Sequence, residues 1–191
     1  MSEHWTFYRT KIHNVSDSQK QTMISICNTF RFCYNWAVAL YKENLEKQIY
    51  MSFFDLTDEF TKFRNLPGNE WLLDYDLNTC RFALANAHQA FENYLNRRTD
   101  FPKFKTKKHS KMTFQVRGER IAFFGDDNRY LRIPGLGRSR KGNSLDCKHH
   151  RIPVGPDIDY YNTVITYDGK DFWLSLSIKE DKQDPEPDND D

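Results

Sequence analysis

The chain has 191 residues, of which 38% are hydrophobic, including 15 Phe and 10 Tyr. This length fits one domain or two small ones, with enough apolar residues for a core. No run of 18 apolar residues occurs and no basic segment followed by an apolar one opens the chain, so we expect no transmembrane helix, no signal peptide and no membrane partner. The four cysteines form no C-x-x-C pair, which argues against a zinc ribbon and favours free buried thiols in a reducing cytoplasm.

The formal net charge of +1 conceals a segregation of charge along the chain. Residues 180–191 contain seven acidic residues and one Lys, whereas residues 1–179 contain 27 Lys and Arg against 20 Asp and Glu. Within residues 101–152 the net charge is +10. Such a concentration of positive charge is typical of a nucleic-acid-binding protein, and the alternative is an ordinary domain with one basic face.

The first part of the chain predicts a strand followed by a long helix. Residues 4–12 alternate and are rich in aromatic and β-branched side chains, which favours a strand. Ser16 and Gln19 have the spacing of a capping box. Apolar residues then recur at helical spacing, so we expect a helix over residues 17–46.

Two further helices are expected before the pattern changes. Ser52 can cap a helix over residues 53–64, and Asp76 can cap another over residues 77–98, with a short apolar plug at 70–73 between them. The side chains expected to point inward from the last helix are Phe82, Ala85, Phe91, Tyr94 and Leu95.

From residue 112 the apolar period changes to two, which favours strands. Asp168-Gly169 predicts a hairpin turn into a final strand over residues 171–179. One strand before the helices and several after them indicate an α+β fold, a small barrel interrupted by a helical insertion. The tail is expected to be disordered because it has almost no apolar side chains. The other strands are expected over residues 112–117, 120–124, 130–133, 147–152 and 161–167.

A basic and aromatic stretch, residues 100–111, separates the helical part from the strands. Its lysines could neutralise phosphates and its rings could stack on exposed bases. The alternative is a solvated lysine loop. The members of this stretch are Phe101, Pro102, Lys103, Phe104, Lys105, Lys107, Lys108 and Lys111.

Several short motifs follow one another along the chain: Arg31-Phe-Cys-Tyr-Asn35, Trp71-Leu72, Phe82-Ala-Leu84, Ala90-Phe91, Phe101-Pro-Lys-Phe-Lys105, Ile133-Pro-Gly-Leu-Gly-Arg138 and Phe172-Trp-Leu-Ser-Leu176. Their order and spacing resemble those of a known family, the insertion-sequence TnpB (OrfB) proteins. These proteins are RNA-guided relatives of compact type V CRISPR effectors, and the chain is similar to their N-terminal half.

The resemblance implies an oligonucleotide-binding-like β-barrel, the wedge domain, over residues 1–15 and 99–179. A helical recognition bundle over residues 16–98 is inserted after its first strand, and residues 180–191 form an acidic disordered tail. The family continues into an RNase H-like nuclease domain that uses metal ions held by separated carboxylates. We expect this chain to lack that domain, to hold no cofactor itself and to be inactive alone, with Mg²⁺ needed only by a nuclease domain supplied elsewhere.

The resemblance also implies which residues read the DNA motif beside the target. Asn and Gln can pair with adenine edges and Arg with guanine. Leu77 would contact a thymine methyl group or pack, Asn78 could instead satisfy its own backbone, and Phe53 is expected to pack in the core. The implied motif-reading residues are Phe53, Thr57, Leu77, Asn78, Arg81 and Gln115.

A second group would hold the backbone of the guide RNA and of its heteroduplex with DNA, while base pairing supplies sequence specificity. Arg31 and Asn35 are interpreted as structural residues that tie the helices to the barrel. A metal site at Cys147, His149 and His150 is disfavoured because no second ligand cluster accompanies it. The implied backbone contacts are Lys103, Lys105, Lys107, Lys108, Lys111, Arg117, Arg120, Arg138, Arg140 and Lys141.

Together these features predict a transposon-associated, nucleoid-associated protein that forms the nucleic-acid-binding portion of a TnpB-like RNA-guided DNA endonuclease. Its expected partners are guide RNA, target DNA and, for cleavage, a separate RNase H-like nuclease subunit. Two alternatives stay open: a stand-alone, nuclease-free DNA-binding regulator or repressor, and an inactive transposon gene fragment.

Overall fold

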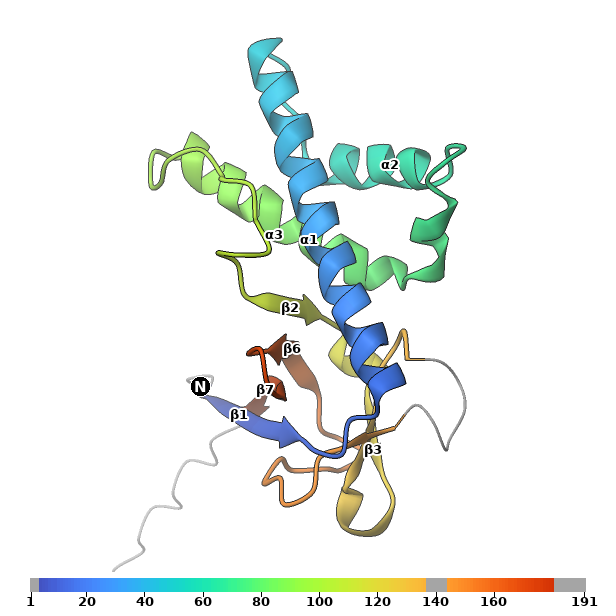
Figure 1. The fold of residues 1–191 in the computed structure, drawn as a ribbon. Coiled ribbons are helices and arrows are strands. Elements are labelled where there is room, and N and C mark those ends of the chain that lie inside the picture. The colour runs from blue at the N-terminus through green and yellow to red at the C-terminus, as the bar shows by residue number, and fades with distance from the viewer. Residues whose placement is uncertain (1–3, 137–143, 181–191) are drawn as a thin grey trace, which may run out of the picture.

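The computed structural model describes residues 4–136 and 144–180. Its helices lie in one half of the molecule and most of its strands in the other (Figure 1). The helices are α1 (Asp17–Glu46), α2 (Phe53–Arg64) and α3 (Leu77–Leu95), with short 3-10 turns η1 (Glu70–Asp74), η2 (Gly118–Arg120) and η3 (Asp126–Asn128). The strands are β1 (His4–Ile12), β2 (Met112–Gln115), β3 (Ala122–Phe124), β4 (Tyr130–Arg132), β5 (Leu145–Asp146), β6 (Tyr160–Tyr167) and β7 (Phe172–Glu180).

All three helices begin where the capping residues predict. Ser16 accepts the backbone N–H of Gln19 and forms the expected capping box with it. Ser52 caps α2, and Asp76 accepts the backbone N–H of Thr79 at 2.9 Å at the start of α3. Because each cap satisfies backbone donors that the first turn leaves free, these starts are local properties of the sequence.

The end and the buried face of α3 differ from the expectation. The helix ends at Leu95, since Arg97 adopts a left-handed conformation and the backbone N–H of Arg98 turns back to the carbonyl of Asn93. Leu95 is 39% exposed, and Phe91 is the one fully buried member of the expected inward set. The buried face of the helix is set by its contacts with α1, α2 and β2. Its buried residues are Thr79, Cys80, Ala83, Leu84, Ala87 and Phe91.

The strands form two antiparallel sheets and not the closed barrel that was expected. One sheet has the order β1-β7-β6-β2 and the other the order β3-β4-β5. An isolated bridge between His13 and Asp146 joins the end of β1 to β5. The three helices lie between β1 and β2 along the chain, although both strands belong to the same sheet. The expected hairpin at Asp168-Gly169 is confirmed and connects β6 to β7.

The strand expected over residues 147–152 is wrong. β5 ends at Asp146, and the backbone N–H of His150 bonds to the carbonyl of Cys147 to form a turn. His149 adopts a left-handed conformation within it, which is incompatible with an extended strand. The apolar residues Cys147 and Ile152 still reach the core from this turn.

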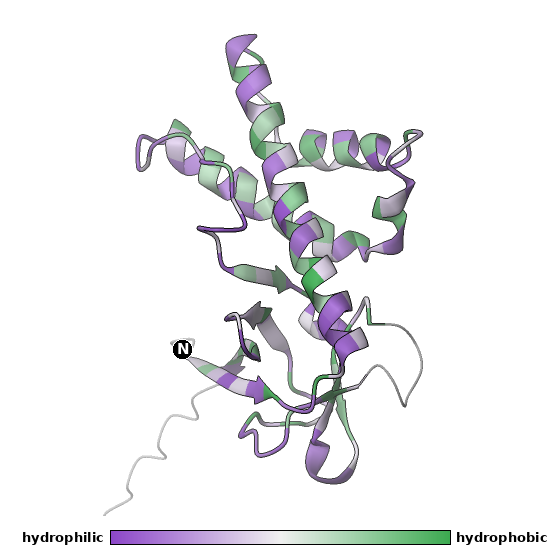
Figure 2. Cartoon of the chain, in the orientation of Figure 1, coloured by the Kyte–Doolittle hydropathy of each residue, from purple (hydrophilic) through white to green (hydrophobic). Residues whose placement is uncertain are grey.

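One continuous core joins the helices to both sheets. α1 contributes a buried stripe from Met23 to Tyr41, and its largest contact surfaces are with α3 and β2. Figure 2 shows hydrophobic and hydrophilic residues alternating along each helix, as expected of helices with one buried face. The four cysteines lie in this core as free thiols, and burial raises the pKa of Cys27 and of Cys147 to about 12.

Asn35 of α1 ties this helix to the basic stretch. Its side-chain amide donates to the carbonyl of Lys105 at 2.8 Å, and its Oδ1 accepts the backbone N–H of Lys105, also at 2.8 Å. This pairing supports the interpretation of Asn35 as a structural residue.

Replacing Asn35 with alanine should lower the free energy of unfolding by about 2 kcal/mol, because two backbone hydrogen bonds lose their partner. Urea denaturation followed by circular dichroism measures this loss. Asn96→Ala is the control, since the Asn96 amide bonds to the carbonyl of Glu92 in the adjoining helix α3 and not to a distant segment of the described chain. Equal stability of the two variants would contradict a tie between α1 and the loop.

Candidate nucleic-acid interface

A groove of about 730 Å³ lies between α3, β2 and the start of β6. Four of the six residues implied to read DNA line it: Phe53, Asn78, Arg81 and Gln115. They come from three elements that are separated by up to 62 positions in the sequence. The fold therefore brings most of this set to one place.

The polar members of this set have hydrogen-bonding groups to spare. Within residues 4–136 and 144–180, the side chain of Asn78 forms no hydrogen bond, so it is not occupied by its own backbone. Gln115 Oε1 accepts the Asn86 amide at 3.0 Å, which fixes its orientation and leaves its NH₂ group available to donate. Arg81 is exposed and forms no ion pair in the described parts of the chain. These three side chains can therefore meet base edges without first breaking strong contacts.

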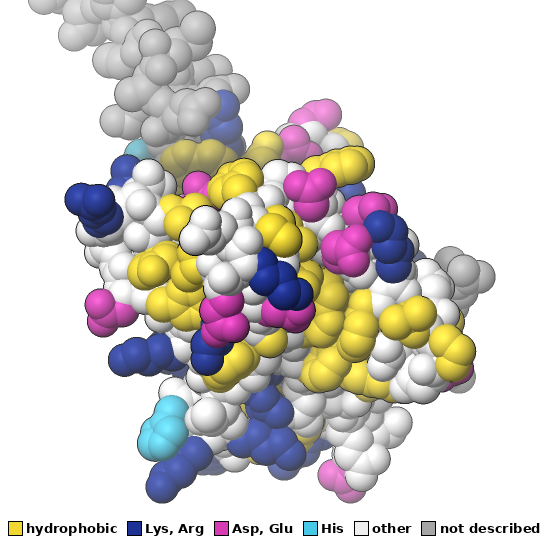
Figure 3. Space-filling model, turned by 90° about the horizontal axis from the view of Figure 1, so that it is seen from above, with side chains coloured by type: hydrophobic (Ala, Val, Ile, Leu, Met, Phe, Trp, Pro, Cys, Tyr) yellow, Lys and Arg dark blue, Asp and Glu magenta, His cyan; other side chains and the backbone are white. Residues whose placement is uncertain are grey.

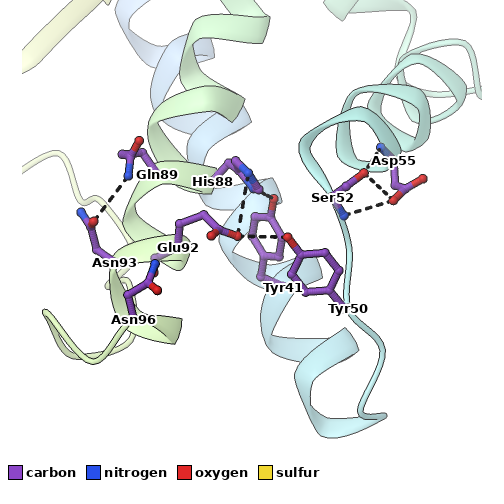
Figure 4. A network of polar contacts seen from close by, with 9 residues as sticks. All are labelled: Tyr41, Tyr50, Ser52, Asp55, His88, Gln89, Glu92, Asn93 and Asn96. Atoms are coloured by element: carbon purple, nitrogen blue, oxygen red, sulfur yellow. Dashed lines mark hydrogen bonds and ion pairs between the residues drawn. The ribbon is translucent and has the colours of Figure 1, made fainter.

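Phe53 forms an aromatic wall of the groove and does not pack in the core, contrary to the expectation. It is 36% exposed, and its ring centre lies 5.5 Å from that of His88. His88 is held in turn by Tyr41, whose hydroxyl lies 2.6 Å from Nδ1, and it neighbours Glu92 (Figure 4). Burial lowers the pKa of His88, so the imidazole that supports Phe53 is neutral near pH 7.

The other two implied readers lie outside the groove. Thr57 donates its hydroxyl to the carbonyl of Phe54 at 2.9 Å, one turn back on α2. Leu77 is half-buried and packs against the core, in agreement with the alternative that it is a packing residue. Neither side chain contributes to the groove lining.

The floor of the groove was not predicted from the sequence. β6 carries a bulge between Tyr161 and Val164, and Asn162 within it has a left-handed conformation. Thr163 is 2% exposed, and its hydroxyl has no hydrogen-bond partner among the described residues. Gly118 packs so closely on Tyr160 that a Cβ would lie 1.5 Å from the Tyr160 carbonyl oxygen. The regular alternation of residues 161–167 gives no local signal for the bulge.

The charges of the groove are balanced. Arg81 and Arg117 face Glu119 and Asp159 among its lining residues, and Arg117 pairs with Glu119 at 3.0 Å. A phosphate channel requires an excess of cations, whereas base edges require mixed donors and acceptors. The groove is therefore better suited to base edges than to the nucleic-acid backbone.

Four of the ten expected phosphate contacts are free lysines that do not line the groove. Lys103, Lys107, Lys108 and Lys111 are exposed and form no ion pair within the described ranges. Lys105 differs, because its ammonium lies 3.8 Å from the centre of the Tyr34 ring and burial lowers its pKa. The four exposed lysines can thus meet phosphates directly, whereas Lys105 already has a partner.

The expected arginine contacts are divided between paired and undescribed residues. Arg117 pairs with Glu119, and Arg120 bonds to Asp76 at 2.7 Å, which ties the η2 turn to the start of α3. Arg138, Arg140 and Lys141 lie outside the described residues.

The two phenylalanines of the basic stretch have different environments. Phe101 packs edge-on against Phe91 and Tyr94, with ring centres 6.1 and 5.3 Å away, and Pro102 is buried. Phe104 is 53% exposed, so it does not anchor the loop in the core. Its ring stays available to a partner.

Comparison with known proteins gives one informative match. No protein-family model matches the chain. It is similar to the "Putative RNA-guided DNA endonuclease InsQ" of Escherichia coli (strain K12), with 24% identity over 127 residues. The alignment covers 66% of this chain but 31% of that protein. The match agrees with the resemblance to the TnpB proteins.

Cys147, His149 and His150 do not gather as metal ligands. The backbone N–H of Ile152 donates to His150 Nδ1 at 3.1 Å, and His150 Nε2 lies 2.9 Å from the carbonyl of Asn128. Across residues 4–136 and 144–180, no three His, Cys, Asp or Glu side chains converge as a metal site would require.

The end of the molecule formed by the helices is chemically mixed. Figure 3 looks down on it and shows apolar side chains interspersed with charges of both signs. Of the helices described, none is both long and apolar enough to cross a membrane. The exposed large apolar residues of this part of the chain include Ile49, Tyr50, Phe54, Leu66, Trp71 and Leu73.

Proposed function

We propose that this chain binds guide RNA and target DNA as the nucleic-acid-binding portion of a TnpB-like RNA-guided DNA endonuclease. The observation that supports the proposal most is the groove. Asn78 and Arg81, from the first turns of α3, share it with Gln115 from the end of β2. A helix that presents polar side chains from its first turns can enter a major groove, where Asn, Gln and Arg distinguish base pairs.

The surroundings of the groove suit the sugar-phosphate backbone of a nucleic acid. The exposed lysines precede β2, and the balanced groove lies at the other end of this strand. A duplex with its base edges in the groove could therefore place phosphates near cations outside it. In this proposal a nuclease domain outside residues 4–180 performs the cleavage and holds the Mg²⁺ ions, on the same polypeptide or on a separate subunit.

RNA that co-purifies with the protein tests the guide-binding part of the proposal. The protein is expressed with its native locus, purified and stripped of RNA by increasing salt, and the RNA is sequenced. We expect one discrete RNA from that locus, released by salt as phosphate contacts predict. Bulk cellular RNA or none would contradict guide binding and would favour a DNA-binding regulator.

Arg81→Ala should weaken binding of the RNA-loaded protein to its preferred duplex about tenfold, because one bidentate base contact is worth about 1–3 kcal/mol. Selection from a randomised duplex library identifies the preferred sequence, and fluorescence anisotropy measures affinity. Binding to an unrelated duplex should change little.

Arg98→Ala is the matched control for this measurement. Arg98 is exposed just beyond the end of α3 and lies outside the groove, so the variant loses the same charge elsewhere. Equal losses for the two variants, on preferred and unrelated duplexes alike, would show that Arg81 acts as a general charge and does not read bases.

A further inference from the structure

The outer face of the four-stranded sheet carries aromatic and cationic side chains that the groove does not explain. The register of β1, β7 and β6 places alternate residues on the two faces of the sheet. Phe172, Leu174, Leu176 and Ile178 of β7 point to the core. Their alternates define the outer face, which comprises Trp5, Phe7, Arg9 and Lys11 of β1, Trp173, Ser175, Ser177 and Lys179 of β7, Tyr161 and Val164 of β6, and Gln115 of β2.

Phe7 is the clearest anomaly on this face. It is 75% exposed, and a Phe side chain left in water forgoes the stabilisation that burial would give. The residues opposite it on β7 and β6 are Ser177 and Tyr161. Ser177 is fully buried and its hydroxyl accepts the Asn162 amide at 3.0 Å, so it is Phe7, on the edge strand β1, that stands exposed on this face. Phe7 is therefore placed to meet a flat partner.

Trp173 and Arg9 form a second planar element on the same face. The Arg9 guanidinium carbon lies 4.6 Å from the centre of the Trp173 ring. The Trp173 indole N–H donates to Asp168 at 2.8 Å, which fixes the orientation of the ring. A guanidinium held over a fixed indole can offer its outer side for stacking and a charge for a phosphate.

The charge of the outer face favours an anionic partner. Arg9 is exposed and forms no ion pair within the described ranges. Lys11 is paired with Asp171 at 2.7 Å, which offsets one charge. The aromatic residues and an uncompensated arginine thus occur together on one surface, as in sheets that bind unpaired bases.

The outer face is continuous with the groove. Trp5, Tyr161 and Gln115 belong to both surfaces. The rings of Trp5 and Tyr161 meet edge to face, with centres 5.0 Å apart. A strand that leaves the groove past these rings would next reach Phe7 and then Arg9. Residues two apart on a strand are separated by about 7 Å, close to the spacing of successive nucleotides in an extended single strand.

We propose that the outer face of the sheet binds a single-stranded nucleic-acid segment, with a base stacked on Phe7 and another on the Arg9–Trp173 pair. The site extends the proposed function, because the segment would continue from nucleic acid held in the groove. It is nevertheless separable from the groove, since Phe7, Arg9 and Trp173 do not line it. Both RNA and DNA single strands have the required chemistry.

The test compares Phe7→Ala with wild type in fluorescence anisotropy titrations of the full chain. The probes are fluorescein-labelled single strands of 20 uridines or 20 thymidines and a labelled duplex. Phe7→Ala should weaken single-strand binding about tenfold, as expected for one lost stacking contact, and leave duplex binding unchanged. Phe7→Tyr should restore it and Phe7→Leu should not. A larger loss with uridines than with thymidines would identify RNA as the ligand, and the converse would identify DNA.

Phe54→Ala is the matched control, because Phe54 is 78% exposed on α2 and lies outside both surfaces. Loss of single-strand binding in Phe7→Ala but not in Phe54→Ala supports the site on the sheet face. This result is independent of the groove: if Arg81→Ala left duplex binding intact, the role of the groove would be refuted but the site on the sheet face would not. Unchanged single-strand binding in Phe7→Ala would overturn the proposal. So would a dimer of wild-type protein that Phe7→Ala dissociates while single-strand affinity stays the same, since the face would then contact a second copy.

Discussion

Replacing Gly118 with alanine should lower the free energy of unfolding by about 3 kcal/mol, because an added Cβ would overlap a backbone atom that cannot move away. The nearest atom, the carbonyl oxygen of Tyr160, would lie at 1.5 Å. Tyr160 is held in β6 by its pairing with Ile178 of β7. The clash must therefore push η2 away from β6 and open the floor of the groove. Chemical denaturation measures the loss of stability.

Gly155→Ala provides the control for this substitution. A Cβ at Gly155 would meet its nearest neighbour, the Ile158 side chain, at 3.5 Å, an ordinary contact. The Gly155 variant should therefore match the wild type within about 0.5 kcal/mol. If Gly118→Ala were equally stable, the close packing of η2 on β6 would be contradicted. If the Gly118→Ala protein folds, it should also bind the preferred duplex no more tightly than an unrelated duplex.

Replacing Asp146 with asparagine should lower the free energy of unfolding at pH 7 by about 2–3 kcal/mol, since its carboxylate binds Arg129, beside β4 in its own sheet, and Asn14, beyond the end of β1 in the other sheet. The Asp146 side chain is 8% exposed and accepts two bonds from Arg129, at 2.8 and 2.6 Å. It also accepts the Asn14 amide at 2.8 Å and the backbone N–H of Lys148 at 3.1 Å. Asparagine can accept at only one side-chain atom, so several of these donors lose their partner.

This stabilisation should depend on pH. The Arg129 guanidinium beside Asp146 holds the pKa of that carboxyl well below its usual range. In the unfolded chain the pKa is about 3.9, so the stabilisation is complete above about pH 5 and is lost as the pH falls towards the folded value. The difference between wild type and Asp146→Asn should therefore narrow below about pH 4.

Urea denaturation of wild type and variant between pH 3 and 8 measures that difference. Asp157→Asn is the control, because Asp157 is exposed and forms no ion pair in the described parts of the chain. A constant difference between wild type and Asp146→Asn across this range would contradict an ionised carboxylate as the link between the sheets.

Local chemistry made much of the fold predictable from the sequence. Ser16, Ser52 and Asp76 satisfy backbone N–H groups within one turn of themselves, so the helix starts follow from neighbouring residues. The alternation along β7 and the Asp168-Gly169 turn likewise act over a few positions. The resemblance to the TnpB proteins identified four residues that line the groove. The spacing of these residues along the sequence could not have identified them as a group.

The expectations that failed depend on contacts between distant segments. Whether the strands close into a barrel or form two sheets depends on how their edges pair, and in the described parts of the chain the two sheets are bridged at His13 and Asp146 alone. Phe53 has the helical spacing of a core residue, yet its side chain reaches the groove because α3 carries His88 beside it. The bulge of β6 depends on its pairing with β7 and on the approach of Gly118.

The sequence by itself therefore determined the helix starts, the order of strands and helices, and the concentration of positive charge before β2. Only the tertiary structure decided that Asn78, Arg81 and Gln115 share a groove and that Phe7 and Arg9 share a sheet face. The physical reason is the distance along the chain over which each kind of interaction acts. Caps and turns are satisfied within a few residues, whereas a groove and a sheet face exist only after segments far apart in the chain have packed together.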